Sequence, residues 1–158
     1  MRVKVNAEVP YKKHKVRRLE RLLGRMMRIM DLGGNLELSV VLVGNERIQE
    51  LNLKYLGNNE VTDVLAFPQL TKDELAEAVR ARPACPEVLG DIVICLPAAR
   101  EQAEEIGSQE EAMLDLLAVH GLLHLIGYDD MTDKGAGQMQ VMEIELLGRN
   151  IYRKIEEE

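Results

Sequence analysis

The sequence of 158 residues has only two cysteines, no apolar run long enough to cross a membrane, and no internal repeat or low-complexity linker. Cys85 and Cys95 are too few and too isolated for a disulfide framework or a thiolate metal site, so we expect both to be reduced and to act as small apolar fillers of the core. The N-terminal residues lack the apolar segment of a secretory signal peptide. These absences predict a cytoplasmic protein without a membrane span.

Charge is unevenly distributed along the chain. The net charge of −7 argues against a general nucleic-acid binder. Residues 1–30, however, contain ten Lys/Arg and two Asp/Glu, a balance of +8, and the remaining residues carry −15. The basic side chains of one predicted helix form either an ordinary solvated face or a local phosphate-binding patch. They are Lys12, Lys13, Lys15, Arg17, Arg18, Arg21, Arg25 and Arg28.

Hydrophobic periodicity predicts strands and helices that alternate within one domain. Strands are predicted at 2–9, 36–43, 62–68 and 89–96, and helices at 12–30, 46–56, 71–80, 98–106, 109–126 and 134–154. The pattern favours an α/β (α+β) domain in which a mixed, mostly parallel four-stranded sheet packs against five to six helices. The helix at 109–126 is apolar on nearly all sides and is therefore expected to be buried.

Several details of these helices are also predicted. Thr71 and Glu74 form a capping box in the otherwise irregular stretch 69–88, and Ser108 and Asp133 are expected to cap the last two helices. The apolar side of the last helix is expected to consist of Met142, Ile144, Leu147, Ile151 and Ile155.

The buried helix ends in the sequence His-Gly-Leu-Leu-His-Leu-Ile-Gly-Tyr-Asp-Asp, residues 120–130. His120 and His124 share a helix face, and Gly127 can end the helix in a left-handed turn that folds the chain back. Asp130 then supplies an oxygen to the point that the histidines face. Three ligands with an open position are typical of hydrolytic metal sites. The alternative, two packed histidines without a metal, predicts a metal-free protein.

The spacing of the two histidines and the following glycine also occurs in zinc proteases. In those enzymes the residue after the first histidine is a glutamate that acts as general base. Here that residue is Gly121, so the base is missing and peptide hydrolysis is not favoured.

Three segments together resemble the YbeY family of bacterial rRNA maturation factors, which are metal-dependent endoribonucleases. They are Leu51-Asn52 with Thr62–Pro68, Gly90–Ile94, and His120–Asp129. The resemblance implies one Zn²⁺ per chain, or another divalent metal, held by His120, His124 and Asp130. It also implies a single endoribonuclease-like domain over residues 1–158 that cleaves single-stranded RNA, matures the 3′ end of 16S rRNA and acts in ribosome quality control.

The resemblance further implies that rRNA and the small ribosomal subunit are partners of the chain. Basic residues of the first helix would then hold the RNA backbone: Lys12, Lys13, Lys15, Arg17, Arg18 and Arg21. Asp129 would either hydrogen-bond a histidine ligand or relay a proton, or would simply form the turn.

Two residues depart from the family pattern. Asp130 stands where the family has histidine, and we expect the site to bind metal with a less acidic bound water because the carboxylate adds a full negative charge. Leu56 replaces an arginine thought to meet phosphate, and Lys54 lies about 200° away around a helix. These departures keep open a second reading, a ribosome-assembly or RNA-binding factor with a structural metal and weakened catalysis.

Overall fold

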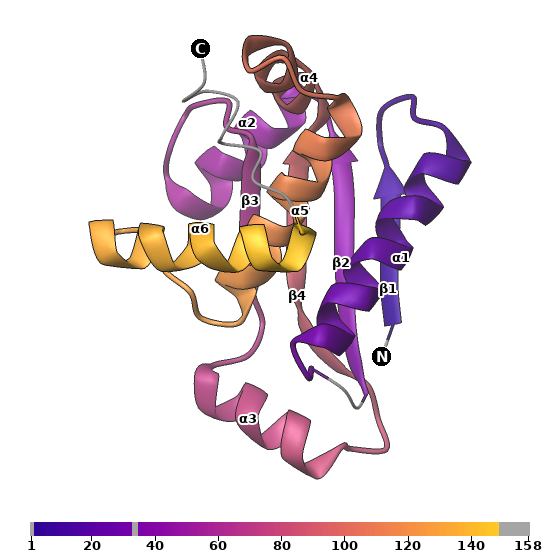
Figure 1. Ribbon diagram of the computed structural model, residues 1–158, viewed down its shortest axis with the longest axis vertical. Coiled ribbons are helices and arrows are strands. Elements are labelled where there is room, and N and C mark those ends of the chain that lie inside the picture. Colours follow the sequence, from indigo (N-terminus) through magenta and orange to yellow (C-terminus); the bar gives the residue numbers. More distant parts are fainter. Residues whose placement is uncertain (1, 33–34, 149–158) are drawn as a thin grey trace.

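The computed structural model describes residues 2–32 and 35–148, which form four strands and six helices (Figure 1). The elements follow one another in the order that the periodicity predicts. The strands are β1 (Arg2–Ala7), β2 (Leu36–Val43), β3 (Val64–Pro68) and β4 (Glu87–Cys95). The helices are α1 (Lys13–Ile29), α2 (Asn45–Leu56), α3 (Lys72–Ala81), α4 (Leu96–Glu105), α5 (Glu110–Leu125) and α6 (Asp133–Leu147).

The four strands form one mixed sheet in the order β1-β2-β4-β3. β1 pairs with β2 and β2 with β4 in parallel, whereas β3 pairs with β4 in the antiparallel sense. The predicted α/β fold with a mostly parallel four-stranded sheet is therefore confirmed. β1 and β3 are the two edge strands, so the basic N-terminal part of the chain and the Thr62–Pro68 segment lie at opposite edges of the sheet.

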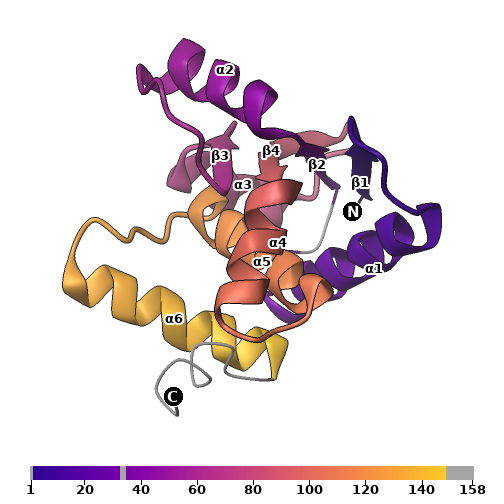
Figure 2. The ribbon, with the colours of Figure 1, turned by 90° about the horizontal axis from the view of Figure 1, so that it is seen from above.

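Helices cover the two faces of the sheet unequally. α2 lies on one face, and α1, α4, α5 and α6 lie on the other (Figure 2). α5 is central to this second layer, and twelve of its sixteen residues are buried, as expected for a helix that is apolar on all sides. No helix of the described residues is both long and apolar enough to cross a membrane.

Hydrogen bonds at the helix ends differ from two predictions. The capping box of Thr71 and Glu74 at α3 is confirmed. Ser108 does not cap α5: the N-cap residue is Gln109, without a side-chain cap, and the Ser108 N–H donates to Ala103 O at the end of α4. Thr132, not Asp133, caps α6, and its hydroxyl accepts a hydrogen bond of 3.0 Å from the N–H of Gly135.

The buried face of α6 also differs from the predicted one. Gly148 adopts a positive φ of +67° and ends the helix at Leu147, and the predicted continuation, 149–154, with Ile151 and Ile155, lies outside the described residues. The buried residues of α6 are Met139, Glu143 and Leu146. The helix therefore turns a glutamate inward.

The two cysteines have different environments. Cys95 is completely buried, as expected, but Cys85 is exposed, so its prediction as an apolar core residue is wrong. Cys85 lies in the loop between α3 and β4, where no core element covers it.

Alkylation with iodoacetamide is expected to label Cys85 and to spare Cys95 in the folded protein. Burial raises the pKa of the Cys95 thiol, which lowers its reactive thiolate fraction at neutral pH. Mass spectrometry is expected to find one adduct on native protein and two after denaturation in urea. Rapid labelling of Cys95 in native protein would contradict this arrangement.

Candidate metal centre

The last turn of α5 and the turn after it bring the candidate ligands together. His120 and His124 are one helical turn apart on α5. The helix ends in a Schellman motif, in which the N–H of Gly127 donates to His124 O and the N–H of Tyr128 donates to Leu123 O. Gly127 has a φ of +107°, so the predicted left-handed turn is present. The chain then folds back and places Asp130 opposite the histidines.

The three ligand atoms have separations that suit one metal ion. His124 Nε2 lies 3.1 Å from His120 Nε2, and Asp130 Oδ2 lies 3.5 Å from each of these nitrogens. In a tetrahedral zinc site with bonds of about 2.0–2.1 Å, neighbouring ligand atoms are about 3.4 Å apart. The donor set and its geometry therefore fit a metal with two imidazoles, one carboxylate and a position left for another ligand.

Glu143 of α6 fixes the orientation of His120. Its side chain is buried, and Oε1 lies 2.6 Å from His120 Nδ1. Because a carboxylate accepts, His120 Nδ1–H donates this hydrogen bond and Nε2 presents its lone pair to the other two ligands. Burial alone lowers the pKa of His120, but the hydrogen bond to Glu143 and the charges of Glu143, Asp130 and Asp63 outweigh it, so the pKa is raised.

The ligand atoms face a cleft of about 390 Å³ between α5 and the edge strand β3. Asp63 lies at the entry to β3, where Oδ1 accepts from the N–H of Val64 at 2.8 Å and Oδ2 accepts from Gln102 Nε2 at 3.0 Å. The carboxylate is thereby held near the histidines without being one of the three clustered ligands. The cleft gives a substrate access to the open side of the site.

Close packing against β4 leaves no room for a side chain at Gly121, the position of the catalytic glutamate in zinc proteases. A Cβ at this position would lie 2.8 Å from Ile92 Cγ2 of β4, which is closer than side-chain contacts allow. The general base of zinc proteases therefore has no space beside His120, and the structure agrees with the prediction against peptide hydrolysis.

The two departures from the family pattern lie at the same cleft. Leu56, the last residue of α2, lines the cleft and is 54% exposed. Lys54 does not occupy this position, because its Nζ lies over the ring of Tyr55, 5.2 Å from the ring centroid. An apolar side chain therefore stands at the rim where the sequence resemblance implies a cation.

Asp129 and the basic residues of α1 are not part of the ligand cluster. Asp129 Oδ1 accepts a hydrogen bond of 2.8 Å from the N–H of Met131, and no hydrogen bond joins it to His120 or His124 in the described structure. Its carboxylate therefore shapes the turn that carries Asp130.

The structure divides the six predicted RNA-binding residues into two groups. Lys15 pairs with Glu111 at 2.8 Å, and Arg18 binds Asp115 through two hydrogen bonds. The hydrogen bond from Lys15 lowers the pKa of Glu111. The other four are exposed and have no acidic partner within ion-pair distance among the described residues: Lys12, Lys13, Arg17 and Arg21.

Sequence reasoning did not identify Glu143. A signal was present, because Met139 and Leu146 lie one turn on either side of it and place it on an apolar helix face. A glutamate in that position needs a buried partner. The sequence does not show that this partner is His120, which is 23 residues away.

Comparisons with known proteins agree over almost the whole chain. The sequence model of the family Endoribonuclease YbeY matches residues 4–150. Endoribonuclease YbeY of Bacillus cytotoxicus is 38% identical over 137 residues, 87% of each chain. The protein of the same name from Bacillus cereus (strain ATCC 10987) is 38% identical over 138 residues, 86% of each chain.

A solved structure has the same fold. The solution structure of TM1509 from Thermotoga maritima superposes with a TM-score of 0.64 at 24% identity, over 98% of this chain and 92% of the other. At this identity the likeness concerns the fold alone. The matches to the family and to its curated members bear out the sequence resemblance and the enzyme class that it implies. The chain belongs to the Endoribonuclease YbeY family, whose members are hydrolases acting on RNA.

Proposed function

We propose that residues 1–158 act as one metal-dependent endoribonuclease domain that cleaves single-stranded RNA during ribosomal RNA processing. The observation that carries this proposal is the cluster of His120, His124 and Asp130 at the base of an open cleft, in a chain of an endoribonuclease family. The substrate proposed is the 3′ region of 16S rRNA in the small ribosomal subunit, and the compartment is the cytoplasm.

Zn²⁺ is the metal that the donor set favours, because two imidazoles and one carboxylate with an open position are typical of catalytic zinc. When bound, such a metal polarises a phosphate oxygen and makes a bound water more acidic. Glu143 holds His120 in the ligating tautomer, and the turn formed by Asp129 holds Asp130 in place.

RNA binding would involve the exposed side of α1. Lys12, Lys13, Arg17 and Arg21 are exposed, and cations without ion-pair partners are available for phosphates. Lys15 and Arg18 contribute less, since each is already paired with a carboxylate of α5. Because β1 and β3 are opposite edges of the sheet, α1 would hold RNA at a distance from the cleft.

The chain belongs to an endoribonuclease family, which argues against the alternative of a ribosome-assembly factor with weakened catalysis. One experiment distinguishes this alternative from an active endoribonuclease. Wild-type protein is expected to contain about one metal per chain and to cleave a single-stranded RNA. Asp130→His, which restores the ligand of the family pattern, is expected to keep the metal and to cleave several-fold faster at neutral pH, because a neutral ligand leaves the bound water more acidic. Elemental analysis and gel-based cleavage assays measure both properties.

The neighbouring carboxylate provides the control. Asp129→Asn keeps an acceptor for the Met131 N–H and is expected to leave both metal content and cleavage rate unchanged. If Asp130→His changes neither property, Asp130 is not a ligand. Stoichiometric metal without any cleavage in the wild type would favour the assembly factor.

A further inference from the structure

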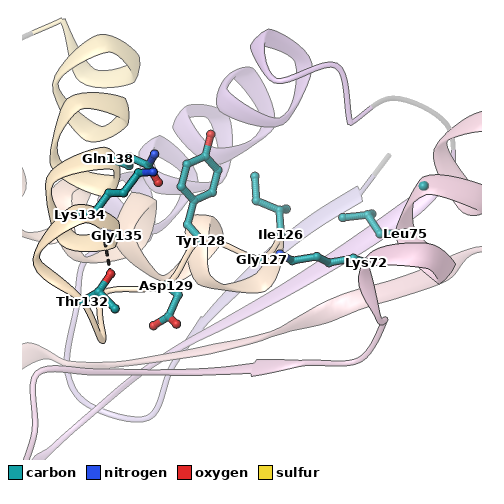
Figure 3. Close-up of a pocket in the computed structure, with 11 residues that line it drawn as sticks. Lys72, Leu75, Ile126, Gly127, Tyr128, Asp129, Thr132, Lys134, Gly135 and Gln138 are labelled. Carbon is teal, nitrogen blue, oxygen red and sulfur yellow. Dashed lines mark hydrogen bonds between the residues drawn. The ribbon is translucent and has the colours of Figure 1, made fainter.

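A second, larger cleft lies on the other side of the turn that carries the ligands. Its volume is about 640 Å³, and it is bordered by α3, the turn after α5 and the start of α6 (Figure 3). Asp129 lines this cleft, whereas Asp130, the next residue, lines the metal cleft. A chain-like substrate that crosses the metal cleft therefore reaches the second cleft by passing over one turn.

Two lysines line this cleft and have no acidic partner within ion-pair distance among the described residues. Lys72 comes from the first turn of α3 and Lys134 from the first turn of α6. By contrast, three arginines in the acidic part of the chain pair with a nearby glutamate: Arg47, Arg80 and Arg100. The two lysines are therefore available to bind anionic groups of a ligand.

Gly127 leaves room for Lys72 beside the turn. The aliphatic part of the lysine lies close to the glycine, with Lys72 Cε only 2.6 Å from where a Cβ of residue 127 would be. The same residue needs its positive φ of +107° to end α5. One glycine thus shapes the ligand turn and leaves room for a cation at its side.

The cleft also contains an aromatic ring, in a chain with only 3% aromatic residues. Tyr128 is half-buried, and one part of its ring packs on the core. Lys134 and Gln138 lie beside the ring, on the side of α6 (Figure 3). A ring fixed in this way provides a face for stacking, and the Gln138 amide provides both a donor and an acceptor for the edge of a base.

We propose that this cleft is a nucleotide subsite in which Tyr128 stacks on an unpaired base of the RNA and Lys72 and Lys134 bind the phosphates on either side of it. The inference rests on the proposed function, because it assigns a place to the strand that crosses the metal cleft. A base is free to stack on a side chain only when it is not held in a duplex. The subsite therefore explains a preference for single-stranded RNA.

Binding of a fluorescein-labelled single-stranded RNA of about ten nucleotides tests the subsite. Fluorescence anisotropy is recorded with a chelator present, so that no cleavage occurs. Tyr128→Leu is expected to weaken binding about tenfold, and Tyr128→Phe, which keeps the ring, is expected to bind as the wild type does. Wild-type protein is expected to bind an abasic RNA about tenfold more weakly than the normal RNA. This comparison needs no protein variant, so it does not depend on whether a variant folds.

The lysines are tested through the salt dependence of binding. Lys72→Gln and Lys134→Gln are each expected to lower the slope of log K against log salt by about 0.7. Lys4→Gln removes the same charge from the exposed residue of the far edge strand β1 and is expected to leave the slope unchanged.

Equal affinity of Tyr128→Leu and wild type for the normal RNA would overturn the subsite. So would a tenfold loss that persists on abasic RNA, because the ring would then act through the fold. Cleavage is measured separately with metal present. If the wild type cleaves RNA but the Tyr128 variants bind RNA equally well, only the subsite is refuted. If RNA binding depends on Tyr128 but the wild type does not cleave, only the proposed function is refuted.

Discussion

His124→Ala protein is expected to lose most of its bound metal and at least about 100-fold in RNA cleavage rate. His124 Nε2 is 3.1 Å from His120 Nε2 and 3.5 Å from Asp130 Oδ2, so alanine leaves a site with two ligands and a wide opening. Changes to groups that only orient a ligand already cost about 10- to 100-fold in affinity or activity, and removal of a ligand costs at least as much. Elemental analysis and a cleavage assay on the same preparation measure the two losses together.

His14→Ala is the matched control for this prediction. His14 is exposed on α1, near its start, and is the one histidine of the chain's three that lies outside the ligand cluster. The control is expected to keep both metal and activity. Cleavage that survives in His124→Ala at the wild-type rate would show that the activity belongs to a contaminating nuclease or to another site on the chain.

Sequence spacing predicted the ligand cluster because its geometry is local. Positions 120 and 124 share a helix face in any α-helix. A glycine three residues later ends that helix in one of a few turn conformations. The remaining distance to Asp130 is one short turn, so a carboxylate after the turn can reach the two histidines, and the family resemblance selects Asp130 over Asp129. Metal binding by these three residues remains a proposal, but their convergence required no long-range information.

Glu143 shows where such reasoning stops. Its pairing with His120 depends on how α6 crosses α5, which is decided by the packing of the whole core. The apolar residues of α6 are numerous enough to suggest more than one inward face, and Glu143 lies between Met142 and Leu147 around the helix, so periodicity alone does not show whether the glutamate is buried. Only the packed structure selects the face in which Glu143 is buried.

The fold was predictable to a similar extent and for similar reasons. The apolar character of residues 36–43 and of 109–126 identifies a strand and a buried helix without knowledge of their neighbours. The exposure of Cys85 and the role of Ser108 at the end of α4 depend on which elements lie beside them. The basic residues of α1 show the same limit, because their spacing does not reveal which of them meet carboxylates of α5.

Arg18→Ala is expected to destabilise the protein by about 3 kcal/mol, since it removes two charge-assisted hydrogen bonds from the almost fully buried carboxylate of Asp115. Asp115 is only 4% exposed, and Arg18 Nη1 and Nη2 donate to its two oxygens at 3.1 and 2.7 Å. This pair joins α1 to the central helix. Urea denaturation is expected to show a lower midpoint with an unchanged slope, and the melting temperature is expected to fall by roughly 6–12 °C.

Arg17→Ala is the control, because it removes the same side chain from the adjacent, exposed position. Its stability is expected to stay within about 0.5 kcal/mol of the wild type. The two variants are expected to have the opposite ranking in RNA binding. Arg17→Ala is expected to lower the salt dependence of RNA binding, and Arg18→Ala is expected to leave it unchanged at temperatures where the variant is folded.

Adding Asp115→Asn to Arg18→Ala is expected to recover part of the lost stability, because a neutral amide is less costly to bury than a carboxylate. If Arg18→Ala is as stable as Arg17→Ala, the ion pair does not stabilise the packing of α1 on α5. Arg18 would then be available to bind RNA phosphates.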